Sequence, residues 1–145
     1  MRPLPEGHIA RLEVQVTDEM TVQFDRLGPL HPVYATYQIA RHFEEAGRLL
    51  LLPYLEPGED AVGSALSVEH LASALPGMRV NITATLDSQD GRRLVASLKA
   101  VSELGDLIAT GHTTQHVMSA QRLQERFAAL QGRWAQQRPQ EEGTP

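Results

Sequence analysis

The stretch VYATYQIARHFEEAGRLLLLP, residues 33–53, decides the fold because it is a long helical segment set between strands. Its apolar positions recur at helical spacing and form one stripe, which consists of Ile39, Ala40, Phe43, Ala46, Gly47 and Leu50. Pro53 ends the helix, since proline cannot continue the hydrogen-bond ladder, and Glu56-Pro57-Gly58 predicts a turn directly after it. We therefore expect one amphipathic helix over residues 33–52, with its apolar face covered by other elements.

Extended segments flank this helix on both sides. Before it, alternating apolar residues predict a strand over His8–Val16 and a second extended piece over Met20–Phe24. After it, alternation predicts four strands, over residues 62–70, 80–86, 94–100 and 107–118, with turn signals such as Asp90-Gly91 between them. Short turns between successive strands imply an antiparallel sheet.

The order of elements favours an α+β hotdog fold, in which an antiparallel sheet curls around a long central helix. A cone-shaped α+β fold of the cystatin-like type is the alternative, but that fold usually opens with helices whereas this chain opens with strands. Apolar spacing also predicts an extra C-terminal helix over Ala120–Arg138. We therefore expect a single domain over residues 1–138 and a disordered polar tail over residues 139–145.

The composition narrows the classes of function. The chain has 145 residues, no cysteine and a formal net charge of -5. The absence of cysteine excludes disulfides, cysteine-ligated zinc and thiol catalysis. An acidic chain is a poor nonspecific nucleic-acid binder, because such binding needs clustered Lys and Arg. The longest apolar run, Leu49–Leu52, is far too short to span a membrane. We expect a cytoplasmic protein that binds neither nucleic acid nor membrane.

Three polar residues fall where the pattern requires apolar ones. On a helical wheel, Thr36 lies inside the apolar stripe of the helix and Glu44 lies at its edge, on the same ridge. His70 shares the strand parity of Val62 and Val68, which predicts that it faces the helix. We therefore expect a hydroxyl, a carboxylate and an imidazole to point into the interior between helix and sheet.

These three side chains suit attack on an acyl carbonyl, which needs a nucleophile or an activated water and a proton donor. They also have ordinary structural explanations. A threonine near a helix start is often an N-cap, and a glutamate at a stripe edge often pairs with an arginine, here Arg41 or Arg48. A histidine on an apolar strand face is often a hydrogen-bonded core residue. Spacing alone leaves both interpretations open.

Other ligand-binding patterns are weaker. His112 and His116 share a strand face but lie about 13 Å apart, too far for one metal ion. The turn Asp90–Arg93 is solvated, and its two arginines are able to contact a phosphate. The sequence contains no phosphate-binding loop, no dinucleotide-binding glycine pattern and no G-x-S-x-G elbow. We expect no bound metal and no organic cofactor.

Two neighbouring segments carry a more specific pattern. They are Pro53-Tyr54-Leu55-Glu56-Pro57-Gly58-Glu59, directly after the helix, and Gly63-Ser64-Ala65-Leu66-Ser67-Val68-Glu69-His70, followed by Leu75-Pro76-Gly77. These segments resemble the fluoroacetyl-CoA thioesterase-like hotdog proteins, and Gly91-Arg92-Arg93-Leu94 is similar too. The resemblance covers roughly residues 8–128.

The resemblance implies a set of site residues. Members of that family use a Thr, a Glu eight residues later and a His on the following strand, and by position these are Thr36, Glu44 and His70. In family terms Glu44 attacks the thioester or activates water, His70 assists proton transfer, and Thr36 hydrogen-bonds within the site. The resemblance also places Gly63 against the substrate, where a glycine lets the backbone approach closely.

The activity that this resemblance implies is hydrolysis of a short or medium acyl-CoA thioester to free acid and CoA. It also implies a homodimer, because hotdog thioesterases of this kind bind CoA across a dimer interface. Two departures stand out: no Phe lies between Phe24 and Phe43, where the fluoroacetate enzyme guards its site, and Gln115 stands where an Arg is expected. One alternative is a hotdog protein that binds acyl-CoA or another thioester without hydrolysing it. A hotdog hydratase is another, but its Gly-Asp-x-Asn-Pro-type segment is missing from the sequence.

Overall fold

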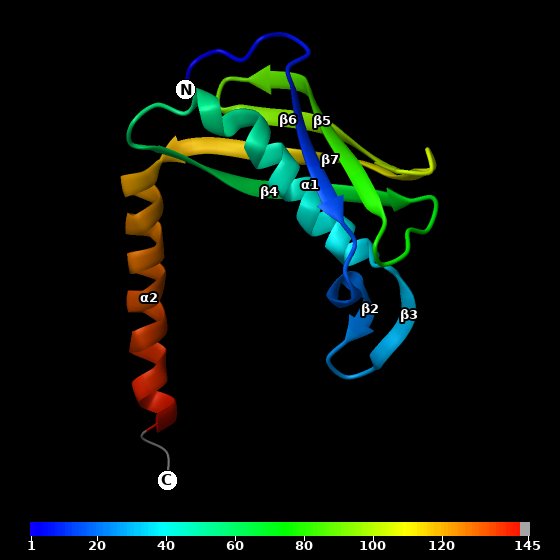
Figure 1. Ribbon diagram of the computed structural model, residues 1–145. Helices are drawn as coiled ribbons and strands as arrows, with labels where there is room; N and C mark the ends of the chain where they lie inside the picture. Colours follow the sequence, from blue (N-terminus) through cyan, green and yellow to red (C-terminus); the bar gives the residue numbers. More distant parts are fainter. Residues whose placement is uncertain (143–145) are drawn as a thin grey trace.

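The computed structural model describes residues 1–142, and Figure 1 labels its helices and strands. In chain order the main elements are β1 (Ile9–Gln15), β2 (Thr21–Phe24), β3 (Gly28–Tyr34), α1 (Thr36–Leu51), β4 (Glu59–His70), β5 (Arg79–Asp90), β6 (Arg93–Ser102), β7 (Leu107–Ser119) and α2 (Ala120–Glu142). Two short 3-10 helices, η1 (Asp18–Met20) and η2 (Leu52–Tyr54), precede β2 and follow α1.

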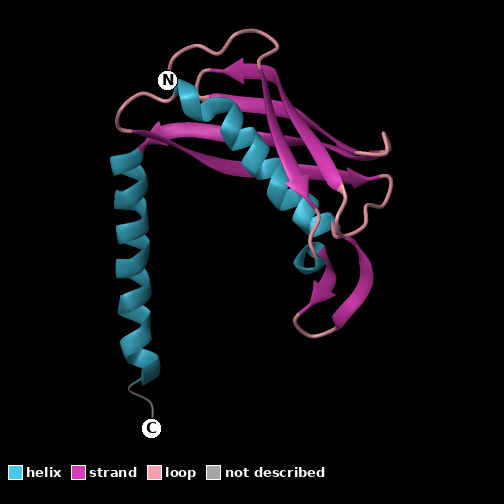
Figure 2. Cartoon of the chain, viewed as in Figure 1, coloured by secondary structure: helices cyan, strands magenta, loops and turns pink. Residues whose placement is uncertain are grey.

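Five strands form one sheet in the order β1-β5-β6-β7-β4, and every neighbouring pair is antiparallel. α1 crosses one face of this sheet, which curls around it (Figure 2). β4 is an edge strand, and within the described residues it pairs only with β7. The predicted α+β arrangement of a sheet around one long helix is confirmed, and the strand-first order matches the hotdog fold.

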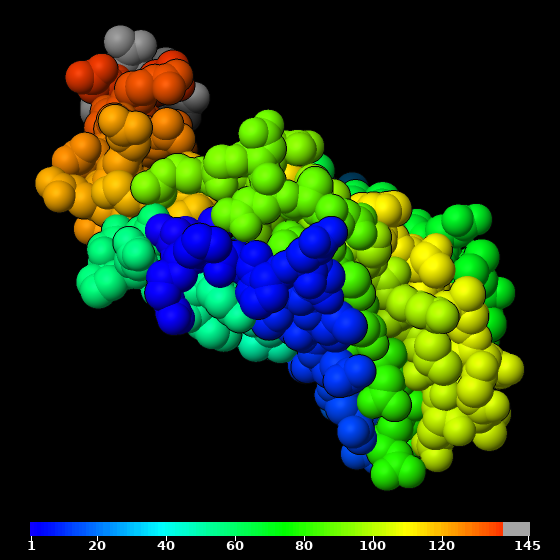
Figure 3. All heavy atoms as spheres, turned by 90° about the horizontal axis from the view of Figure 1, so that it is seen from above, coloured from blue at the N-terminus to red at the C-terminus, as the bar shows by residue number. Residues whose placement is uncertain are grey.

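The apolar stripe of α1 forms the centre of the core. Ile39, Phe43 and Ala46 are fully buried and Leu50 is nearly so. Burying one large apolar side chain contributes about 1.5–3 kcal/mol. Leu4 joins the second core cluster beside Leu50, and Figure 3 shows the N-terminal residues lying against the end of α1. The helix is therefore held at both ends by packing, which fixes the positions of its polar residues.

A β-bulge interrupts β4 at the point where it passes α1. Gly63 lies opposite Gln115 and Ala65 lies opposite Thr114, so Ser64 is an additional residue with no partner in the ladder. Such a bulge locally disrupts the ladder and bends the strand. It also exchanges the two faces of the strand for every residue that follows.

This bulge corrects the predicted strand parity. Val62 and Val68 lie on opposite sides of the bulge along the chain, so they face opposite sides of the sheet, and the predicted common parity of the two is wrong. Residues seven apart, such as Gly63 and His70, would face opposite sides of a regular strand. Because of the extra residue, both face α1.

β2 and β3 form a hairpin that projects from the sheet near the start of α1 (Figure 1). β3 includes Pro29 and Pro32, which the sequence pattern treats only as interruptions. A two-stranded hairpin tolerates proline because its outer edges need no partner. Tyr37 of α1 anchors the hairpin, since the amide of Gln23 donates a hydrogen bond to its Oη at 3.0 Å.

α2 starts directly after β7 and extends away from the sheet (Figure 1). The helix continues to Glu142, past Arg138, where the sequence pattern predicts its end, and it includes Pro139. Residues 143–145 of the predicted disordered tail lie outside the described residues. No helix in the described part of the chain is both long and apolar enough to cross a membrane.

Candidate active site

The first residue of α1 contacts the last residue of β4. Thr36 Oγ1 lies 2.9 Å from His70 Nδ1, a hydrogen bond that orients the imidazole ring. The N-cap position belongs to Ala35, so Thr36 is not the N-cap that its sequence position allows. His70 Nε2 is buried and has no hydrogen-bond partner among the side chains and backbone described for residues 1–137. The ring therefore has one nitrogen fixed and the other left for a further group.

The carboxylate of Glu44 lies against the backbone of β4. A Cβ atom built on Gly63 would lie 2.1 Å from Glu44 Oε1, far inside van der Waals contact. The carboxylate keeps this position because residue 63 is a glycine. The expected partner Arg48 instead donates to the carboxylate of Asp60 and to the carbonyl of Ala61. Among the described residues no ion pair binds Glu44, and its side chain is exposed in the single chain.

Gln115 of β7 borders the same space. Its side chain is buried, and Nε2 lies 3.4 Å from the Cβ position of Gly63. Nε2 donates to Thr113 Oγ1 at 3.1 Å, while Oε1 is buried with no partner in the described chain. Buried amide oxygens are normally hydrogen-bonded, so this oxygen has an unused acceptor position within the described residues. The sequence pattern marked Gln115 only as a departure from the family, although its register opposite Gly63 identifies it as a lining residue.

The predicted site residues form two groups rather than one. The histidine end consists of Thr36 and His70, and the glutamate end consists of Glu44, Gly63 and Gln115. Thr36 and Glu44 are separated by two turns of α1, about 12 Å along its axis. No hydrogen bond joins Glu44 to Thr36 or His70 in the described chain. One chain therefore does not bring the three predicted catalytic side chains into contact.

A further polar pair lies in the core beneath α1. Tyr34 Oη and His42 Nδ1 are 2.5 Å apart, and both side chains are buried. Burial lowers the pKa of His42, with a smaller opposing effect from the nearby Glu45 carboxylate. Burial also raises the pKa of the Tyr34 hydroxyl. Tyr34 belongs to the core cluster, and neither residue of the pair belongs to the histidine end or the glutamate end of the candidate site.

Comparison with known protein families shows which family the chain belongs to. The model of the fluoroacetyl-CoA-specific thioesterase family matches residues 16–121. The chain belongs to this family. The family resemblance seen in the sequence is confirmed, and the matched range includes both ends of the candidate site.

Solved structures and a curated relative agree with the family. A hypothetical protein of Thermus thermophilus, described as a thioesterase superfamily member, is 49% identical with a TM-score of 0.93, covering 94% of this chain and 100% of that chain. A mutant of the fluoroacetyl-CoA-specific thioesterase FlK, solved with fluoroacetate and CoA, is 30% identical with a TM-score of 0.75, covering 83% of this chain and 99% of that chain. These likenesses confirm the hotdog fold.

The curated relative is the fluoroacetyl-CoA thioesterase of Streptantibioticus cattleyicolor. It is 42% identical over 76 residues, which are 50% of this chain and 55% of that protein. The match therefore spans about half the length of that relative.

Proposed function

We propose that this protein hydrolyses an acyl-CoA thioester with a short or medium acyl group to the free acid and CoA. The observation that carries the proposal is the carboxylate of Glu44 held over Gly63 in a member of a thioesterase family. Binding of CoA by a related enzyme supports the choice of substrate, since the FlK mutant was solved with fluoroacetate and CoA.

In this proposal the polar groups of both ends take part in the reaction. Glu44 attacks the thioester carbonyl or activates a water that does so, the carbon–sulfur bond breaks, and His70 assists proton transfer to the departing thiolate. Where Glu44 itself attacks, water then hydrolyses the acyl–glutamyl anhydride, which releases the free acid and regenerates the carboxylate. The bulge at Ser64 leaves backbone groups outside the ladder beside Glu44. An amide in that position suits the developing oxyanion. These groups are all protein groups, so the proposed reaction requires neither a metal nor an organic cofactor.

We further propose that the protein acts as a homodimer in the cytoplasm. β4 is a long edge strand, and residues 63–67 and 69 are exposed along it, with Leu66 40% exposed. Soluble proteins rarely leave such an edge unprotected. Pairing of β4 with β4 of a second copy would cover the edge in a symmetric contact. The same contact would cover the exposed side chains of Thr36 and Glu44.

Antiparallel pairing of two β4 strands would also join the two ends of the site. With the bulge residue Ser64 left out of the count, the midpoint between Gly63 and His70 falls at Ser67, inside the exposed stretch of β4. A two-fold axis there places Gly63 of one copy opposite His70 of the partner subunit. Each dimer would then hold two composite sites, each with a glutamate end from one copy and a histidine end from the other.

Thiol release from a panel of acyl-CoAs tests the proposed activity. We expect Glu44→Gln and His70→Ala to lower kcat/KM at least about 100-fold, a loss of about 2.7 kcal/mol of transition-state stabilisation. Glu45→Gln is the matched control, because Glu45 is the neighbouring exposed carboxylate on α1. Full activity of Glu44→Gln would refute the site. Binding of acyl-CoA without turnover by the wild type would identify a non-catalytic binding protein.

A further inference from the structure

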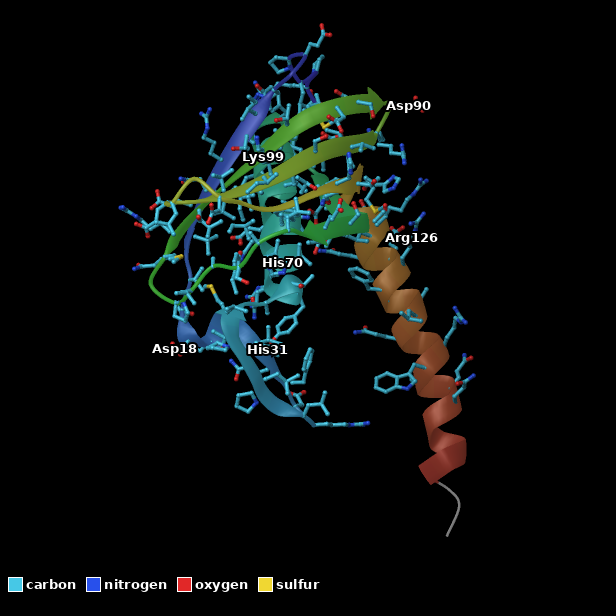
Figure 4. The ribbon with its side chains drawn as sticks, turned by 90° about the vertical axis from the view of Figure 1, so that its right-hand side faces the viewer. Asp18, His31, His70, Asp90, Lys99 and Arg126 are labelled. Atoms are coloured by element: carbon cyan, nitrogen blue, oxygen red, sulfur yellow. The ribbon has the colours of Figure 1, made fainter. Side chains whose placement is uncertain are left out.

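A groove of about 380 Å³ lies at the base of α2. Three arginines from two parts of the chain line it: Arg92 comes from the turn between β5 and β6, and Arg122 and Arg126 come from the start of α2. Residues four apart on a helix share one face, so Arg122 and Arg126 point the same way. Figure 4 shows Arg126 and the β5–β6 turn, marked by Asp90, at the same end of the sheet.

The groove is cationic although the chain as a whole is acidic. One carboxylate, Glu59, lines it, and that carboxylate is already bound by the N-terminal amino group and by Arg92 at 3.0 Å. The hydrogen bond from the N-terminus is the main reason why the pKa of Glu59 is lowered. Arg122 and Arg126 form no ion pair with any side chain described in residues 1–137. Positive charge in the groove therefore exceeds negative charge.

The position of the groove relates it to the candidate site. Glu59 and Ser119 line the groove and lie opposite each other in the β4–β7 pair, as do Gly63 and Gln115 at the glutamate end. Four residues along a strand correspond to about 13 Å. A thioester sulfur and the first phosphate of CoA are separated by the extended pantetheine arm, which can span a gap of this order.

We propose that this arginine groove binds the phosphate groups of CoA while the thioester lies at the glutamate end. Arginine is suited to this role because its planar guanidinium binds phosphate oxygens in pairs. The identity of this ligand, CoA, rests on the proposed function. Arg122 and Arg126 lie outside residues 16–121, the range that the family model matches, so the site is built on the added helix α2.

Kinetics with truncated substrates test the groove. The double variant Arg122→Gln/Arg126→Gln is compared with the wild type on acyl-CoA, acyl-4′-phosphopantetheine and acyl-pantetheine. We expect KM for acyl-CoA to rise about 10-fold or more, with kcat unchanged, because charge-assisted hydrogen bonds to phosphate are lost. KM for acyl-pantetheine, which has no phosphate, stays the same. Arg11→Gln is the matched control, since Arg11 is an exposed arginine on β1 at the opposite edge of the sheet.

The substrate series also identifies the phosphate that is bound. A rise in KM for acyl-4′-phosphopantetheine as large as that for acyl-CoA supports the groove and places the 4′-phosphate in it, a group that carrier proteins also present. A rise for acyl-CoA alone supports the groove and places the nucleotide phosphates there. An unchanged KM for acyl-CoA overturns the inference.

Calorimetry with CoA keeps this test separate from the proposed activity. We expect the wild type to bind CoA more tightly than the double variant does. The two proteins should have the same affinity for pantetheine. If the wild type hydrolyses no acyl-CoA, the proposed function fails while the binding comparison still decides the groove. If the wild type turns over acyl-CoA and the double variant binds CoA equally well, the groove fails alone.

Discussion

The histidine end and the glutamate end of the candidate site are built in different ways. At the histidine end, a hydrogen bond between the start of α1 and the end of β4 orients His70. At the glutamate end, the position of Glu44 depends on the missing side chain of Gly63, and no ion pair within the described chain holds the carboxylate. The first end is preorganised in one chain, whereas the second is open to solvent until something covers it. A second copy that covers β4 would supply that cover.

A mixed dimer tests this difference with the largest expected change in activity. For the proposed dimer, Glu44→Gln and His70→Ala subunits are purified separately as homodimers and together as a heterodimer selected by two affinity tags. Each homodimer is expected to have about 1% or less of wild-type activity. If each site is composite, the Glu44→Gln subunit supplies an intact His70 and the His70→Ala subunit supplies an intact Glu44 to the same site. The heterodimer then has one intact site, so we expect about half of the wild-type kcat. The measurement is thiol release per heterodimer.

The opposite result has an equally clear meaning. If Glu44 and His70 act within one chain, every site of the heterodimer carries one lesion, and its activity stays as low as that of the homodimers. A heterodimer of Glu44→Gln with wild type is the control, because both arrangements predict one intact site. A monomer by light scattering at micromolar concentration would refute the composite site before any assay.

Adding one methyl group tests the glutamate end by itself. In Gly63→Ala the new Cβ meets Glu44 Oε1, and since the carboxylate is the far end of a flexible side chain, the carboxylate moves and the fold remains. We expect kcat/KM to fall about 10- to 100-fold, because a displacement of this size disrupts catalytic geometry. Ser64→Ala is the control, because it removes only an exposed side-chain hydroxyl and keeps the backbone amide of the bulge. Wild-type kinetics in Gly63→Ala would show that the observed position of Glu44 is not the catalytic one.

Removing one hydroxyl tests the histidine end and should have a smaller effect. Thr36→Ala deletes the hydrogen bond to His70 Nδ1 but leaves the imidazole itself in place. Loss of one such bond costs about 1 kcal/mol, which corresponds to about fivefold in kcat. Thr36→Ser keeps the hydroxyl and should restore most of the activity. Equal losses in the Ala and Ser variants would show that the methyl group of Thr36, rather than the hydrogen bond, positions His70.

The fold follows from the sequence wherever its patterns are regular. The stripe of Ile39, Phe43 and Leu50 predicts a buried helix, and the structure buries all three. The sequence pattern does not predict β3, because Pro29 and Pro32 disfavour a strand. The strand tolerates them because the hairpin stands apart from the main sheet. The sequence pattern also does not predict the helical residues after Arg138, because proline normally ends a helix.

The site is less predictable because it depends on an irregular strand. The contact between Thr36 and His70 agrees with the predicted direction of both side chains. Strand parity, however, assigns Gly63 to the face opposite His70, and only the bulge at Ser64 brings it under Glu44. Counting residues cannot locate a bulge, and it cannot reveal that Gln115 lies across from Gly63. The separation of Thr36 from Glu44, in contrast, follows from the sequence, because eight residues of helix span about 12 Å.

A third region, the buried pair of Tyr34 and His42, predicts a pH dependence of folding. Because burial lowers the pKa of His42, the folded protein favours the neutral ring. The unfolded chain then binds the proton more readily, so stability contributed by the neutral ring falls as pH drops below about 6.5. Each pKa unit of lowering corresponds to about 1.4 kcal/mol. His42→Gln keeps a hydrogen-bonding side chain beside Tyr34 Oη and cannot titrate. Urea unfolding from pH 8 to pH 5 should therefore show a steeper loss of stability in the wild type than in this variant, and parallel curves would assign the loss to other groups.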